Sequence, residues 1–106
     1  MYRKEMENMN DILKTNDIND VRSYYKRRYK KILDALEMKC AKDFRVDKSC
    51  YGYLELSCKI RGRSFSVNMG INNKYNTWLK SNNYFEATKR NSFSTMREAV
   101  AFIETL

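Results

Sequence analysis

Residues 51–71, YGYLELSCKIRGRSFSVNMGI, decide the fold of this chain. Apolar and polar side chains alternate on both sides of Arg61-Gly62, and this period-2 pattern around a two-residue turn predicts a β-hairpin. A two-residue loop also fixes the register, because it pairs three sets of apolar residues: Leu54 with Met69, Leu56 with Val67, and Cys58 with Phe65. Every apolar residue then meets an apolar partner, so one face of the hairpin should be buried.

The other face of the hairpin combines aromatic rings with cations. Tyr51 and Tyr53 lie on the same side as Lys59, and Arg61 and Arg63 stand at the tip. Bases stack on aromatic rings and phosphates pair with cations, so this face is a candidate site for single-stranded nucleic acid. The alternative is that the tyrosines are present because Tyr favours strands, or that the following loop covers them.

Upstream of the hairpin, residues 18–42 are expected to form one long helix. Asn16 and Asp17 precede it, and both are good helix N-caps. Apolar residues recur at helical spacings of three and four: Ile18, Val21, Tyr25, Tyr29, Ile32, Leu36 and Cys40. A shorter amphipathic helix is expected over residues 2–14.

The opposite side of the expected long helix is strongly basic. Six cations fall within ten residues: Arg22, Lys26, Arg27, Arg28, Lys30 and Lys31. Such a stripe can contact a phosphate backbone, which gives affinity without reading the base sequence. The alternative is a solvated helix face whose charge is partly balanced by Asp20, Asp34 and Glu37.

Downstream of the hairpin, residues 72–83 are polar and are expected to form a loop. A third strand is expected over residues 84–89, and a helix over residues 76–89 is the alternative. Three aromatic residues in this region are candidates for a protein interface or for a plug at the core edge: Tyr75, Trp78 and Tyr84. The chain should close with a helix over residues 95–105, because Thr95 and Glu98 match a capping box.

These elements predict a single α+β domain over residues 1–106. The expected architecture is a two-layer sandwich in the order α-α-β-β-β-α: two N-terminal helices, an antiparallel hairpin or three-stranded sheet, and a C-terminal helix. The order of helix, three strands and helix is similar to that of the double-stranded-RNA-binding domain. That family carries a basic K-K-x-A-K patch at its last helix, whereas residues 94–99 here read STMREA, and the chain has no His for the family's His-bearing loop. The similarity therefore extends to the order of elements alone.

Composition excludes several kinds of chemistry. The chain has no His, which excludes Ser-His-Asp catalysis and His-ligated zinc. Its three Gly match no phosphate-binding loop, and Cys40, Cys50 and Cys58 never form a C-x-x-C motif. We therefore expect a protein that is not an enzyme and that needs no cofactor or metal.

Net charge indicates the class of partner. The 106 residues carry 21 Lys and Arg against 13 Asp and Glu, a formal charge of +8. A cationic folded domain attracts polyanions. We therefore expect a small basic binding protein that engages DNA or RNA through the basic helix face and the hairpin. The alternative is an inhibitor that docks on a host nucleic-acid-handling complex, as anti-CRISPR proteins do.

The setting can also be predicted from the sequence. An abundance of Asn and Lys is typical of AT-rich genomes, including those of phages and mobile elements. The N-terminal residues carry charges throughout and no apolar signal segment, and no apolar run is long enough to span a bilayer. A cytoplasmic protein without a membrane partner is expected.

Overall fold

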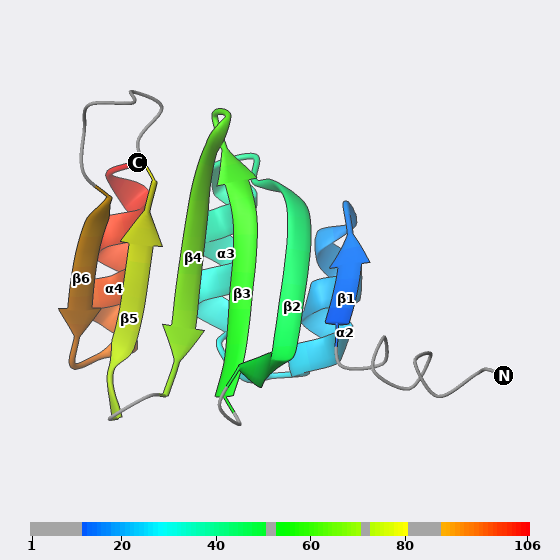
Figure 1. Cartoon of the computed structure of the whole chain (residues 1–106), viewed down its shortest axis with the longest axis horizontal. Helices are drawn as coiled ribbons and strands as arrows, with labels where there is room; N and C mark the ends of the chain where they lie inside the picture. Colours follow the sequence, from blue (N-terminus) through cyan, green and yellow to red (C-terminus); the bar gives the residue numbers. More distant parts are fainter. Residues whose placement is uncertain (1–11, 51–52, 71–72, 81–87) are drawn as a thin grey trace, which may run out of the picture.

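The computed structural model describes residues 12–50, 53–70, 73–80 and 88–106, and it contains one six-stranded antiparallel sheet (Figure 1). Neighbouring strands follow one another in the chain, so the sheet order is β1 to β6 without a crossover. Three helices, α2, α3 and α4, lie on one face of the sheet. The strands are β1 (Ile12–Thr15), β2 (Lys42–Cys50), β3 (Tyr53–Ile60), β4 (Arg63–Met69), β5 (Tyr75–Leu79) and β6 (Lys89–Phe93), and the helices are α2 (Ile18–Tyr25), α3 (Lys30–Met38) and α4 (Met96–Glu104).

The predicted hairpin is confirmed as β3 and β4. Leu56 pairs with Val67 and Cys58 with Phe65, which is the register that a two-residue Arg61-Gly62 turn requires. All four of these apolar side chains are buried. Gly62 takes a positive φ of 80° at the turn, a conformation that glycine adopts without strain.

The predicted sandwich, with its hairpin or three-stranded sheet in the order α-α-β-β-β-α, is wrong, although the protein is α+β. The sheet has six strands, and the first of them precedes the first described helix. Of the helix expected over residues 2–14, residues 2–11 lie outside the described residues, and Ile12–Thr15 form an edge strand that pairs with β2. Two adjacent apolar residues, Ile12 and Leu13, fit either periodicity, and pairing with β2 selects the strand.

Three further strands were not expected where the structure has them. In β2, buried Phe44 and Val46 alternate with Arg45 and Asp47, a strand pattern in a segment that was given no structure. The expected loop over residues 72–83 contains β5, so the alternative helix from residue 76 is also wrong. The last strand lies at Lys89–Phe93 instead of residues 84–89, of which 84–87 lie outside the described residues.

The expected long helix over residues 18–42 is two helices. It begins as predicted after Asp17, whose side chain accepts a hydrogen bond from the backbone N–H of Asn19 at 2.9 Å. The chain then turns between α2 and α3, where Lys26 and Tyr29 both take a left-handed φ of 58°. An unbroken 25-residue helix would span about 37 Å. The nine residues of β2 span only about 30 Å, so two shorter helices cover the sheet better.

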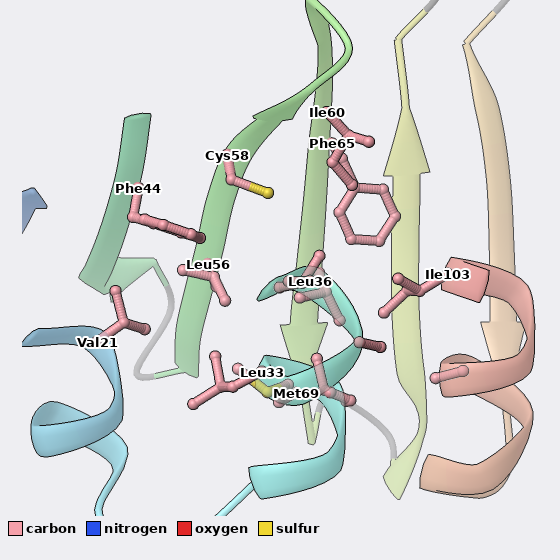
Figure 2. Close-up of a cluster of buried hydrophobic side chains, with 14 of the residues drawn as sticks. Val21, Leu33, Leu36, Phe44, Leu56, Cys58, Ile60, Phe65, Met69 and Ile103 are labelled. Carbon is pink, nitrogen blue, oxygen red and sulfur yellow. The ribbon is translucent and has the colours of Figure 1, made fainter. Parts of the chain in front are cut away.

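One continuous core fills the space between the helices and the sheet. Figure 2 shows Leu33 and Leu36 of α3 pointing toward Leu56 and Met69 of the central strands, with Val21 of α2 at one side. At the other side Ile103 of α4 enters the core. The predicted capping box of α4 is confirmed, with Thr95 and Glu98 each accepting a backbone hydrogen bond from the other. None of the helices in the described part of the chain is long and apolar enough to cross a membrane.

Candidate nucleic-acid interface

The face of the sheet opposite the described helices α2, α3 and α4 is here called the open face (Figure 1). Residues that pair directly across strands share a face, and alternate residues of one strand point to opposite faces. Because Val46, Leu56 and Val67 are buried under the helices, the residues that immediately precede and follow each of them in its strand belong to the open face. The charged members of this face are Lys14, Lys42, Arg45, Asp47, Glu55, Lys59, Lys80 and Arg90.

One row of side chains crosses the whole open face and includes the single tryptophan. The register links this row, the Trp78 row, from one edge of the sheet to the other: Lys14, Arg45, Ser57, Ser66, Trp78 and Arg90. Neighbouring strands lie about 4.8 Å apart, so the row extends over about 24 Å. Its two ends are basic, its centre is two serines, and Trp78 lies between Ser66 and Arg90.

Trp78 is half-buried and borders a shallow hollow on the open face. The hollow has a volume of about 310 Å³, and Asn76, Arg90 and Ser92 line it beside the indole. Ser92 Oγ donates a hydrogen bond to Asn76 Oδ1 at 2.6 Å, which holds the floor of the hollow together. An indole beside a guanidinium provides a stacking surface for a planar ring together with a positive charge for its phosphate.

Like charges face one another on this surface. Lys14 lies directly opposite Arg45, and Lys42 lies directly opposite Lys59. Two cations paired across strands repel and destabilise the sheet. The presence of two such pairs on one face favours an anion-binding role for that face.

Two carboxylates interrupt the positive field. Asp47 and Glu55 pair across β2 and β3, although the sequence places no second acid near Glu55. Partial burial raises the pKa of Glu55 above its usual value, and the charge of Asp47 raises it further, while Arg45 acts in the opposite direction. The Arg45 guanidinium lies 3.8 Å from Asp47, a loose pair.

The basic stripe expected on one helix does not form a single face. The chain turns between Lys26 and Tyr29, so Arg22 belongs to α2 and Lys30 and Lys31 belong to α3. Arg22 bridges the two helices, since its guanidinium donates to Asp34 at 2.7 Å and to Glu37 at 2.6 Å. These contacts raise the pKa of Arg22 and make it a structural residue.

The other members of that stripe divide in a similar way. Lys30 pairs with Asp34 at 2.9 Å, whereas Lys26, Arg27 and Lys31 are exposed on the helix side of the molecule. The helix side is therefore separated from the open face by the whole thickness of the core.

The structure places two of the predicted hairpin and loop residues on the same face of the sheet. Lys59 and Trp78 both lie on the open face, and exposed Arg61 stands in the turn beside Lys59. Arg63 faces the other way, where its Nε–H donates to the carbonyl of Lys80 at 3.4 Å. Tyr53 belongs to β3, and its side chain lies outside the described residues, as do Tyr51 and Tyr84.

Tyr75 does not join the open face. It packs on the helix side, where its ring contacts the ring of Tyr29 edge-to-face, with 6.2 Å between the two ring centroids.

Five open-face cations were missed by sequence reasoning: Lys14, Lys42, Arg45, Lys80 and Arg90. They lie on or beside strands that were not predicted. The alternation of Phe44 and Val46 with Arg45 and Asp47 is a strand signal that would have found β2 and its cations. Lys14 and Arg90 reach this face through the pairing of β1 with β2 and of β6 with β5, which no local sequence pattern reveals.

Other candidate groups are distant from this surface. Burial raises the pKa of the Cys58 thiol to about 12, so the thiolate is scarce at neutral pH. Within residues 12–50, 53–70, 73–80 and 88–106, no three His, Cys, Asp or Glu side chains gather in a group that could hold a metal ion. Comparison with known protein families, with curated proteins and with solved structures found no match to this chain.

Proposed function

We propose that this protein binds single-stranded nucleic acid on the open face of its sheet. The observation that carries the proposal is the composition of that face, which presents Trp78 in a row with basic ends and is not covered by any of the described helices. A flat sheet with an accessible aromatic ring offers stacking to every base, and flanking cations contact the phosphates without reading sequence.

The distribution of charge supports the open face over the helix side. The open face has six cations and two carboxylates. The helix side has nine cations and six carboxylates, counting the helices with their connecting turn (residues 17–38 and 95–104) and the strand residues Arg63 and Lys89, which face the helices. Carboxylates are more frequent there, and Asp34 and Glu37 pair with Arg22 and Lys30, so the open face, with three cations for each carboxylate, attracts a polyanion more strongly.

The proposal is tested by removing matched numbers of charges from the two sides. In one variant, Arg45→Gln and Arg90→Gln remove two cations from the open face. In the control, Arg27→Gln and Lys31→Gln remove two exposed cations from the helix side. Binding of a labelled single-stranded oligonucleotide is measured by fluorescence anisotropy at low salt. The first variant should lose about tenfold or more in affinity, and the control should lose much less.

A third variant examines the aromatic contact. Trp78→Ala should weaken binding by about 1–3 kcal/mol, because one base loses its stacking partner, and Trp78→Phe should recover part of the loss. Absence of binding to any DNA or RNA at low salt would overturn the proposal. A half-buried Trp78 beside Arg90 would then fit the protein-docking inhibitor, whose affinity for its protein target should depend on Trp78 far more than on any single cation.

A further inference from the structure

A basic hollow lies at one end of the sheet, where β2 begins and β3 ends. It has a volume of about 560 Å³. Its walls are the end of α3, the turn from α3 to β2, and the hairpin turn that is seen at the top of Figure 1. Four cations and one carboxylate line it: Lys39, Lys42, Lys59, Arg61 and Asp43.

The four cations of the hollow outnumber its carboxylate. In the part of the chain that the structure describes, the ion pairs of Arg22, Lys30 and Arg45 lie elsewhere and do not involve the cations of the hollow. Lys42 and Lys59 face one another directly across β2 and β3. Four cations around one concave space, with Asp43 as the single acid, match a compact ligand that carries more than one negative charge.

The backbone around the hollow is unusual and fixed. Cys40, Asp43 and Arg61 all take a left-handed φ, at 57°, 54° and 53°, a conformation that few non-glycine residues adopt. The backbone N–H of Asp43 donates to Asn16 Oδ1 at 2.6 Å, which links the start of β2 to the residue that follows β1. The two-residue hairpin turn accounts for the φ of Arg61, the end of α3 for that of Cys40, and the register shift at the start of β2 for that of Asp43, so local structure sets the shape of the hollow.

We propose that this hollow binds a terminal phosphate monoester of the nucleic acid strand that lies on the open face. The inference rests on the proposed function, because Lys42 and Lys59 belong to both surfaces. A monoester carries about −1.5 to −2 at pH 7, whereas each internal diester carries one charge. The converging cations therefore favour a strand end over the middle of a strand.

The rim of the hollow also suits the end of a strand. Met38 is 83% exposed beside the four cations, the largest exposure of any bulky apolar residue in the described part of the chain. A thioether makes favourable contacts with an aromatic ring. A terminal base can thus contact Met38 while its phosphate enters the hollow.

The test compares two oligonucleotides of about 12 nucleotides, within the range that single-strand-binding folds cover. They share one sequence and differ by a phosphate at the 5′ end, and a second pair differs by a phosphate at the 3′ end. For one of the two ends, the phosphorylated form should bind about tenfold more tightly, as an added charge-assisted contact allows. Equal affinity at both ends would overturn the inference while the strand-binding function stood.

Two sets of variants separate the hollow from the rest of the open face. Lys42→Gln with Lys59→Gln, and Arg61→Gln alone, should abolish the preference for the terminal phosphate. Arg45→Gln with Arg90→Gln should weaken both oligonucleotides and keep that preference. Thermal melting identifies any variant that has lost its fold. Arg61 is exposed in a turn, so Arg61→Gln should fold normally. It therefore tests the hollow by itself if the double variant melts at a lower temperature.

A free nucleoside monophosphate distinguishes the source of the monoester. As a competitor it should displace the phosphorylated oligonucleotide only at far higher concentration than the unlabelled oligonucleotide does. If it competes equally well, the hollow is a free-nucleotide site and the strand-end assignment is wrong. If neither oligonucleotide binds, the proposed function fails, and the inference that rests on it fails too.

Discussion

Leu56 and Ser57 are neighbours in β3 with opposite environments. Leu56 is fully buried and points to the helices, whereas Ser57 lies on the open face with its Oγ 3.1 Å from Ser66 Oγ. The alternation that separates them is the basis for every assignment of a side chain to the open face. Truncation of each residue therefore tests that assignment directly.

We expect Leu56→Ala to lower the free energy of unfolding by about 2–5 kcal/mol, because it removes buried methyl groups and leaves a cavity. Ser57→Ala should cost less than about 1 kcal/mol, since it removes one partly exposed hydrogen bond. Urea denaturation of both variants gives the two values. Similar costs would show that the two faces had been assigned wrongly.

Glu55 is the open-face residue whose charge is least favourable. Its raised pKa, which arises from burial first and from Asp47 second, means that the folded protein holds the proton more tightly than the unfolded chain does. Below the unfolded pKa this residue therefore costs no stability, and as pH rises through the folded pKa the charged form destabilises the fold. Glu55→Gln removes that effect.

We expect Glu55→Gln to raise the Tm at about pH 7 and to leave it nearly unchanged at about pH 4, where Glu55 is largely protonated in the wild type. Melting curves of both proteins across this range provide the measurement. A gain in Tm that became larger toward low pH would contradict this prediction. The same substitution should also strengthen nucleic acid binding, because it removes a negative charge from the open face.

At the scale of elements, α2 and α3 are joined by a small charge network. Arg22 of α2 contacts Asp34 and Glu37 of α3, and Lys30 shares Asp34. Lys30 first and Arg22 second hold the pKa of Asp34 below its usual value. The network fixes the second helix after the turn at residues 26–29.

Arg22→Ala should therefore destabilise the fold, whereas Arg27→Ala, an exposed cation in the turn, should not. The groups are partly exposed and screened by solvent, so the difference should be about 1 kcal/mol. A lowered carboxylate pKa adds stability at neutral pH that disappears as pH falls through the folded pKa. The cost of Arg22→Ala, measured by denaturation, should thus shrink in acid, and a constant cost would indicate lost packing instead.

At the scale of the whole molecule, the fold sorts an evenly distributed sequence charge into two unequal sides. The open face has three cations for each carboxylate, whereas the helix side has more carboxylates, and its Arg22 and Lys30 are paired with them. Binding to a polyanion then depends on how many open-face cations displace counterions from phosphates. The slope of log affinity against log salt concentration measures the number of those contacts.

For four to six phosphate contacts, the log–log slope of affinity against salt should be about −3 to −4 for a single strand. Arg45→Gln with Arg90→Gln should make the slope shallower by about 1.4, from two lost contacts. Arg27→Gln with Lys31→Gln should leave it unchanged. A slope that responded equally to both pairs would show that the charge acts through the net field and not through contacts on the open face.

Local signals were sufficient for part of this protein. The β3–β4 register, the start of α2 at its Asp17 cap and the capping box of α4 were all predicted, because each depends on residues within a few positions of one another. The net charge and the absence of His are likewise properties of the chain itself. These features can be predicted without knowing which helices and strands pack against one another.

The remaining features were decided by tertiary structure. The apolar spacing from Ile18 to Cys40 continues across the turn at residues 26–29, because both helices bury residues against the same sheet, so the periodicity hides the break. The β1, β5 and β6 strands are short, and their backbone groups are satisfied by pairing with a neighbouring strand, which for β1 is β2, far along the chain. The collection of Lys14, Lys59 and Arg90 on one face follows from that pairing, since only the assembled sheet determines which side of each strand is covered.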